Sequence, residues 1–262
     1  MMDLANYPLP IIFLISLVVL LGASEIGRGL GARRAEPDGG DGDRNLSTLE
    51  AASLGLLALM ISFTFGMSLS RFEARRDAVV EEANDIGTTA LRARLLPSPH
   101  NTESLALLRQ YVDLRVSALQ HTATEADLTA IIVKSEAIQE SLWQQAKAAA
   151  AENNSVVPTG LFINTLNEMI DMQDTRLAVI RNKVPDVVLL ALYGIAMVAV
   201  GFVGYCDRQE RRPIRLPGYI MCATTAAVIL LIQDLDRPRA GFVTIDQRPM
   251  LELAETLAHY SD

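Results

Sequence analysis

The sequence of 262 residues contains 31 acidic and 23 basic residues, a formal net charge of −8, and half of its positions are hydrophobic. This excess of acid argues against a nucleic-acid partner. The apolar residues are gathered into four blocks, Pro8–Ala23, Leu49–Ser70, Val184–Cys206 and Leu216–Ile232. Each block is close to the ~20 residues that a helix needs to cross a hydrocarbon core of about 30 Å. The sequence therefore predicts an all-α, multi-pass integral membrane protein with four transmembrane helices.

The first transmembrane helix is expected within residues 1–30. Its flank, "MMDLANY", has no Lys or Arg, whereas a signal peptide needs a positively charged n-region. We therefore interpret this block as a span, and cleavage of a signal peptide at "GASE" is the alternative. Glu25 lies near the end of the span, where a carboxylate marks either the membrane edge or an ion path.

A linker rich in Gly and Asp, residues 31–47, separates this span from a long second helix. From Thr48 the helical pattern continues through the second apolar block to Leu96, before "LLPSPHN". At 1.5 Å per residue, a helix over 48–96 is roughly 70 Å long, more than twice the hydrocarbon thickness. The second helix must therefore project far beyond the bilayer as an extramembrane extension.

Residues 97–184 contain three further helical patterns, which start near Thr102, Thr124 and Pro158. Each pattern has one apolar stripe, so none of these helices is stable alone. Two intervening helices and the extensions of the second and third spans are expected to form a four-helix bundle. The third pattern continues through Pro185 into the third span.

The rest of the chain is expected to consist of a third transmembrane helix at 185–206, a basic loop at 207–215 and a fourth transmembrane helix at 216–234. The last segment, residues 235–262, is expected to be a C-terminal tail. No strand-like alternation competes with the helical patterns in the central region.

The extension of the second helix has an apolar face toward the bundle, formed by Phe72, Val79, Ala83, Ile86 and Ala90. Two polar faces complete it, one with Arg71, Arg75, Glu82 and Asp85, the other with Glu73, Asp77, Glu81 and Asn84. Arg76 falls inside the apolar stripe, where a guanidinium needs a partner.

Charged residues at the exits of the second and fourth spans are expected on the same side of the membrane, because two crossings separate them. We predict a membrane-boundary charge network of Arg71, Arg75, Arg76, Asp234, Asp236, Arg237 and Arg239. In the alternative interpretation, each charge reaches the lipid headgroups separately.

The two short connections are basic. The first carries Arg28, Arg33, Arg34 and Arg44, and the third carries Arg208, Arg211, Arg212 and Arg215. The positive-inside rule then places both short connections in the cytoplasm, both termini outside, and the central bundle on the extracytoplasmic side.

No residue pattern predicts catalysis, a cofactor or a metal site. His100, His121 and His259 are scattered, and neither a nucleophile elbow nor a Walker loop is present. Cys206 and Cys222 lack CxxC spacing and fit packing in the membrane. We therefore expect no enzyme.

Two segments, "FGMSLSRFEARRDAVVEEANDIGTTALRARLLP" and "DLDRPRAGF", resemble bacterial membrane proteins with a bestrophin-like domain. The order of four spans around a helical middle extends this resemblance over nearly the whole chain. It implies a location in the bacterial inner membrane, but no established activity.

A more distant resemblance is to the bestrophins, pentameric anion channels whose second helix lines a hydrophobic neck. Their "SFxxG" pattern is matched by Ser62, Phe63 and Gly66. The resemblance implies that Phe63 and Met67, with Leu59 one turn earlier, face a pore as apolar rings, whereas core packing is the alternative. Bestrophins keep their termini and central region in the cytosol, opposite to the orientation that the arginines predict.

Two functions follow as hypotheses. The first is a homo-oligomeric ion channel for a small anion, with the second helix lining the pore. The second is a membrane-anchored sensor or scaffold with an extracytoplasmic bundle and no catalytic activity. An intramembrane hydrolase that uses Asp234 or Glu25 is the remaining enzymatic alternative, although nothing assembles a nucleophile beside them.

Overall fold

The computed structural model describes residues 8–33, 41–120, 125–207, 215–238 and 241–260, and these fold into helices joined by short connections. In chain order the α-helices are α1 (Leu9–Arg33), α2 (Asp41–Ala93), α3 (His100–Gln120), α4 (Glu125–Glu152), α5 (Leu161–Arg181), α6 (Asp186–Asp207), α7 (Arg215–Asp236) and α8 (Arg248–Ala258). Four helical stretches, which include α1, α2, α6 and α7, are long and apolar enough to cross a membrane. The predicted all-α membrane protein with four spans is confirmed.

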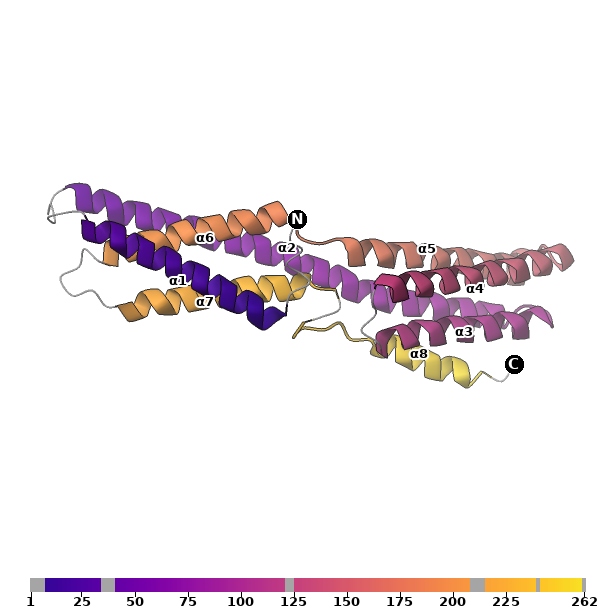
Figure 1. Ribbon diagram of the computed structural model, residues 1–262. Coiled ribbons are helices and arrows are strands. Elements are labelled where there is room, and N and C mark those ends of the chain that lie inside the picture. The colour runs from indigo at the N-terminus through magenta and orange to yellow at the C-terminus, as the bar shows by residue number, and fades with distance from the viewer. Residues whose placement is uncertain (1–7, 34–40, 121–124, 208–214, 239–240, 261–262) are drawn as a thin grey trace. The chain divides into compact units, whose positions relative to one another are not determined.

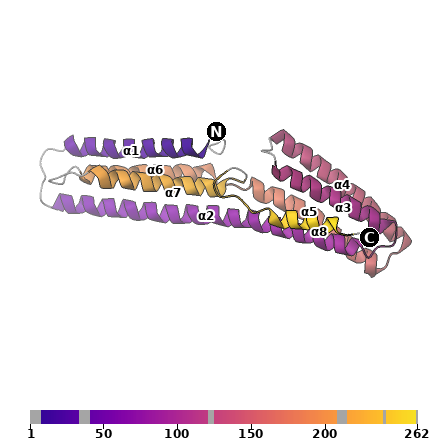
Figure 2. The same cartoon turned by 90° about the horizontal axis from the view of Figure 1, so that it is seen from below.

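The second helix, α2, is one continuous α-helix of 53 residues. Figure 2 shows its ribbon without a break. It begins at Asp41, seven residues before the expected start, so the connection that precedes it is shorter than the sequence pattern indicates. No proline interrupts it, and its glycines do not bend it out of the α conformation. The prediction that the helix continues unbroken from Ser70 to Gly87 is confirmed.

One compact unit contains the membrane spans and comprises the described parts of Met1–Phe72 and Asn182–Thr244. In it α1 lies against α6 and α7 (Figure 1). Leu57 of α2 joins a core of buried side chains from these helices, which include Leu20, Leu192 and Ile229. The outward faces are apolar as well, which is typical of helices surrounded by lipid.

Small residues allow α1 and α6 to approach closely. A Cβ atom at Gly27 would overlap the backbone carbonyl of Gly201, and a Cβ atom at Gly204 would overlap that of Ser24. Close backbone contact gives transmembrane helices the van der Waals packing that lipid tails cannot supply.

The second compact unit comprises the described parts of Glu73–Arg181 and Ile245–Asp262. Side chains from α2, α3, α4, α5 and α8 share one core, in which Ile86, Leu108, Leu142 and Phe162 are fully buried. The expected bundle is therefore present, and its fifth helix comes from the chain's C-terminal part. The expected continuation of α5 through Pro185 into the third span is wrong, because residues 182–185 are not helical.

Helix α8 lies in the segment expected to be only a tail. Met250, Leu253 and Leu257 form its buried face, and Arg109 of α3 donates from Nε to the carbonyl oxygen of Leu257 at 2.9 Å. The spacing of these three residues is helical, but the helix has only 11 residues and becomes stable by packing on the bundle.

His100 links the start of α3 to α4. Its Nδ1–H donates to Oε1 of Gln145 at 2.9 Å, and its Nε2 lies 3.4 Å from a carboxylate oxygen of Glu152. These two partners, Gln145 first, raise the pKa of His100 above its ordinary value of about 6.5, although burial opposes them.

A raised pKa predicts that protonated His100 stabilises the fold. This stabilisation is complete below about pH 6.5 and is lost as the pH rises through the higher pKa of the folded state. We expect the thermal midpoint of the full-length protein in detergent to fall between pH 6 and pH 8.5, and to fall less in a His100→Gln variant. An equal pH dependence in the two proteins would contradict this role of His100.

Candidate functional site

The apolar candidates for a pore lie on an exposed face of α2. Leu59 and Phe63 are 51% and 63% exposed, and Met67 is half-buried at the edge of the same face. On the opposite side of the helix, Thr64 and Ser68 are buried. Core packing within the monomer therefore does not account for Leu59 and Phe63.

An acidic row continues this face along the same helix in the second unit. Glu73, Asp77 and Glu81 are spaced by four residues and are all exposed. At 100° per residue, these three positions lie within about 40° of the direction of Leu59. One exposed face of α2 thus changes from apolar to acidic as the helix leaves its membrane-spanning part.

The buried face of this extension contains an ionic cluster centred on Glu82. Arg115 of α3 approaches one oxygen of this carboxylate at 2.5 Å, and Arg176 of α5 is paired with the other. Glu82 is fully buried, and burial lowers the pKa of Arg115. Two guanidiniums on one carboxylate offset the cost of placing charges in the core and connect three helices.

A second polar layer lies beside this cluster. The hydroxyl of Tyr111 donates to Oε1 of Gln173 at 3.1 Å, and Gln139 donates from Nε2 to the same oxygen at 3.2 Å. The Tyr111 ring also lies 5.8 Å from the guanidinium carbon of Arg115. Polar side chains of α3, α4 and α5 are therefore matched to one another inside the bundle.

The sequence pattern misplaced three residues of α2, namely Arg75, Arg76 and Glu82. Arg75 is buried with 2% of its surface exposed, whereas Arg76 is exposed, so the prediction that Arg76 lies in the apolar stripe is wrong. Glu82, expected on a polar face, is buried as well. Because other helices of the bundle pack around α2, its buried face is wider than the predicted apolar stripe and includes Ala78 and Thr89. These small residues were the sign in the sequence that the buried face is wider.

The two acids in the last turn of α7, Asp234 and Asp236, accept hydrogen bonds from backbone N–H groups. Asp234 accepts from the N–H groups of Phe242 and Val243 at 2.9 and 3.1 Å, and a Cβ atom at Gly241 would overlap its carboxylate. Asp236 accepts from the N–H of Val184 at 3.0 Å. These bonds explain why "DLDRPRAGF" contains both acids and a glycine: Asp234 holds the chain after α7, and Asp236 holds the non-helical segment 182–185 before α6.

One arginine of the predicted charge network, Arg71, has hydrogen-bond partners outside that network. Arg71 donates to Oδ1 of Asn182 and to the carbonyl oxygen of Met67, both at 3.2 Å. Arg76 lies near Asp246, whose pKa is lowered chiefly by its hydrogen bonds from Arg248. Pairing of Arg71, Arg75 or Arg76 with Asp234 or Asp236 stays a prediction.

Several arginines of the sequence predictions lie outside the described residues, namely Arg34, Arg208, Arg211, Arg212 and Arg239. The side chain of Arg44 is likewise not described. Arg237, just after α7, has its pKa lowered by burial, which the charge of Asp234 opposes.

Glu25 takes part in a cluster at one end of the spans. Its carboxylate accepts from the hydroxyl of Tyr219 at 2.7 Å and lies 3.9 Å from Arg28. Arg28 is buried and closer to Asp207, at 2.7 Å. The structure thus gives Glu25 partners on α1 and α7 rather than an isolated position in the membrane.

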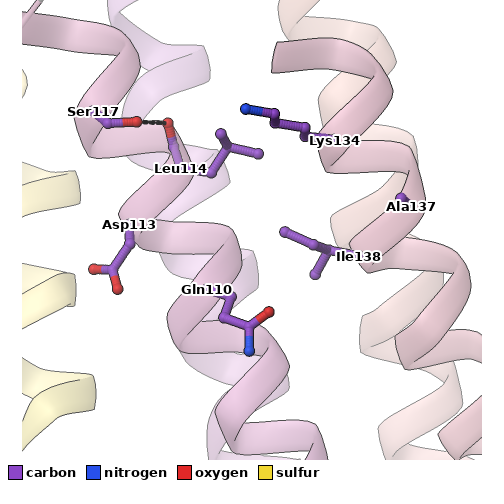
Figure 3. A pocket seen from close by; sticks show the side chains of 7 residues that line it. All are labelled: Gln110, Asp113, Leu114, Ser117, Lys134, Ala137 and Ile138. Atoms are coloured by element: carbon purple, nitrogen blue, oxygen red, sulfur yellow. Dashed lines mark hydrogen bonds between the residues drawn. The ribbon is translucent and has the colours of Figure 1, made fainter. Parts of the chain in front are cut away.

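The surface of the bundle also has an open groove of about 520 Å³ between α3 and α4 (Figure 3). Asp113 and Ser117 line one wall, while Lys134 and Ile138 line the other. The charges do not converge on one point, so this groove defines no ligand class. Among the described residues, no group of His, Cys, Asp and Glu could hold a metal ion.

Comparison with known proteins identifies a bestrophin-like domain over residues 45–250. The chain is similar to a crystal structure of a bacterial bestrophin homolog from Klebsiella pneumoniae, with 15% identity, coverage of 95% of this chain and 96% of that chain, and a TM-score of 0.65. A variant of that homolog with an aspartate replaced by alanine gives 14% identity, coverage of 95% and 97%, and a TM-score of 0.68. These similarities show a shared fold. No curated protein sequence matches the chain.

Proposed function

Since the chain belongs to the bestrophin-like family, we propose that it forms a homo-oligomeric ion channel in the bacterial inner membrane, with the exposed face of α2 toward the pore. One observation carries this proposal. The face of α2 that bears Leu59 and Phe63 stays exposed in the monomer and continues into the acidic row of Glu73, Asp77 and Glu81.

The apolar part of this face suits a gate. In a ring of subunits, Leu59 and Phe63 would each contribute one layer of apolar side chains, with Met67 at the edge. Hydrophobic constrictions close a pore by excluding water, without needing a plug. Side chains on one continuous helix also keep a fixed spacing along the path.

The acidic part of the face favours cations over anions. Rings of Asp and Glu side chains attract cations and repel anions at the entrance of a pore. Because Glu73, Asp77 and Glu81 would repeat in every subunit, each position would contribute a ring of carboxylates. We therefore propose a cation path, in place of the anion path that the distant resemblance to bestrophins implies.

Charge-neutral substitutions in this row test the selectivity. The triple variant Glu73→Gln, Asp77→Asn, Glu81→Gln is expected to lower the permeability of K⁺ relative to Cl⁻ in reconstituted liposomes, measured as a shift of the reversal potential toward that of Cl⁻. The control neutralises Glu136 and Glu140, exposed acids on α4. An unchanged reversal potential in the triple variant would overturn the assignment of the acidic row.

The oligomeric state separates the channel from the sensor or scaffold. We expect the mass of the purified protein in mild detergent to correspond to a ring of several copies. A monomer or a dimer would contradict the channel and favour a scaffold that acts through a partner protein.

For the orientation, the arginine count supports short connections in the cytoplasm and an extracytoplasmic bundle. A cysteine introduced at Ser117, which is exposed on α3, would then react with an impermeant thiol reagent added to intact cells. Reaction only after cell lysis would show the opposite orientation.

A further inference from the structure

Phe242 is the most exposed large apolar side chain in the described part of the membrane unit, with 74% of its surface accessible. It lies in the short non-helical segment 241–244 after α7. The backbone N–H groups of Phe242 and Val243 donate to the two carboxylate oxygens of Asp234 at 2.9 and 3.1 Å. A Cβ atom at Gly241 would overlap the same carboxylate. The fold therefore holds the backbone of this segment against α7 and leaves the aromatic ring uncovered.

Asp234 lies on the outward side of α7. Four exposed residues mark that side, namely Ile220, Thr224, Ala227 and Leu231. At 100° per residue, the other three residues and Asp234 lie within about 40° of the direction of Ile220. Only 2% of Asp234 is exposed, however. The segment that it binds therefore lies over the outward side of α7 at the last turn of the helix.

This last turn stands at an edge of the membrane-spanning part. Helix α7 has 22 residues, or about 33 Å at 1.5 Å per residue, which matches a hydrocarbon core of about 30 Å. Charged residues gather at this end of the spans: Asp236 is the last residue of α7, and the exposed Asp186 begins α6. Phe242 is held by Asp234, two residues before the end of α7, so it lies at the boundary between the apolar and the polar part of the unit.

The apolar surface on this side ends at the depth where the span ends. The outward stripe of α7 from Ile220 to Leu231 carries no charge, Phe242 extends it by about one turn, and the exposed Thr244 follows. A surface that meets lipid must change from apolar to polar at the edge of the hydrocarbon core, whereas a contact with a second copy has no reason to end there. Aromatic rings suit this level, because they bury apolar area beside the lipid headgroups.

We infer that the segment 241–244 is a membrane anchor, in which Phe242 inserts its ring into the bilayer beside the end of α7. Asp234 positions the ring through its two hydrogen bonds to the backbone of the segment. The anchor holds the chain at the membrane surface before it continues to α8. It concerns the outward surface of a single subunit and does not depend on ion conduction.

Tryptophan fluorescence of the full-length protein in liposomes tests the anchor. Phe242→Trp is combined with Trp143→Phe, so that the introduced indole is the only one in the chain. The liposomes consist of phosphatidylethanolamine and phosphatidylglycerol with phosphatidylcholine brominated either near the headgroup or near the methyl end of its acyl chains. We expect emission at a short wavelength and loss of intensity mainly to the bromines near the headgroup.

Two matched variants calibrate this measurement in the same Trp143→Phe protein. Leu231→Trp, on the outward side of α7 and deeper in the span, should lose more intensity to the deep bromines than Phe242→Trp does. Ala148→Trp, at an exposed position on α4 of the bundle, should emit at a longer wavelength without quenching.

Two results for Phe242→Trp would overturn the inference. Emission like that of Ala148→Trp, without quenching, would place the ring in water. Emission at a short wavelength that neither brominated lipid quenches would mean that a second copy covers the ring.

Adding Asp234→Ala to the Phe242→Trp protein tests the role of the carboxylate. Quenching by the bromines near the headgroup should decrease, because the segment loses both hydrogen bonds, and circular dichroism shows whether the helices are retained. Unchanged quenching would show that Asp234 does not position the ring.

Discussion

Replacing Glu82 with alanine is expected to lower the free energy of unfolding of the central bundle by about 3–5 kcal/mol, because the change leaves two buried guanidiniums without their shared carboxylate. The measurement is thermal unfolding of the full-length protein in detergent, followed by circular dichroism. Glu81→Ala is the matched control, since Glu81 is the neighbouring residue and is exposed. Its effect should stay within about 0.5 kcal/mol, as for other surface changes. Similar losses in the two variants would show that Glu82 does not hold the bundle together.

A compensated variant distinguishes the loss of a partner from the loss of the ion cluster itself. When Glu82, Arg115 and Arg176 are replaced together by leucine or methionine, no charge is left in the core. Buried ion clusters replaced by apolar residues of similar volume are often as stable as the original. We therefore expect this triple variant to recover most of the stability that Glu82→Ala loses.

A second large effect is expected from Gly204→Ala in α6. The added Cβ atom would overlap the backbone carbonyl of Ser24, and no rotation of a side chain can relieve that overlap. Overpacking of this kind typically costs about 1–3 kcal/mol. Here the cost is expected at the upper end, since α1 and α6 must separate along their contact.

Gly194→Ala is the control for this change, because Gly194 is on the same helix and a Cβ atom there would meet nothing within 4 Å. The thermal midpoint and the yield of monodisperse protein should fall for Gly204→Ala and stay unchanged for Gly194→Ala. Equal behaviour would mean that α1 and α6 do not depend on close backbone contact.

The membrane spans and the continuous second helix could be predicted because their signals are local. A run of about 20 apolar residues needs no partner to be interpreted as a span, and the stretch from Ser70 to Gly87 contains no residue that would end a helix. Helix α8 also has a local signal, the helical spacing of Met250, Leu253 and Leu257. A helix of 11 residues is stable only when it packs on the bundle, however, and the sequence alone does not show that contact.

The buried charges could not be predicted because their partners are distant in the sequence. From the sequence alone, Glu82 is predicted to be a surface residue. Its partners Arg115 and Arg176 lie on two other helices, α3 and α5, and only the fold places them beside it. Asp234 and Asp236 are predicted to pair with arginines, which stays a prediction, and the structure shows that both accept hydrogen bonds from backbone N–H groups. Because nearly every residue has a backbone N–H, the sequence does not indicate which of them a carboxylate will accept from. The hydrogen bonds of Asp234 and Asp236 to backbone N–H groups could therefore be found only in the structure.

For the candidate pore residues, one property could be predicted from the sequence and another could not. Their spacing along α2 follows from the sequence, and so does the direction shared by Leu59 and Asp77. That this face stays exposed depends on which sides of α2 the other helices occupy.

The most direct test is chemical modification of Phe63→Cys in a protein whose Cys206 and Cys222 are replaced by alanine. In liposomes, this variant should conduct K⁺, and a charged methanethiosulfonate reagent should block the flux. Leu14→Cys, an exposed position on α1, is the control and should conduct without being blocked. Flux no greater than that of empty liposomes, from a verified oligomer, or an equal response of the two variants would contradict a pore lined by the second helix.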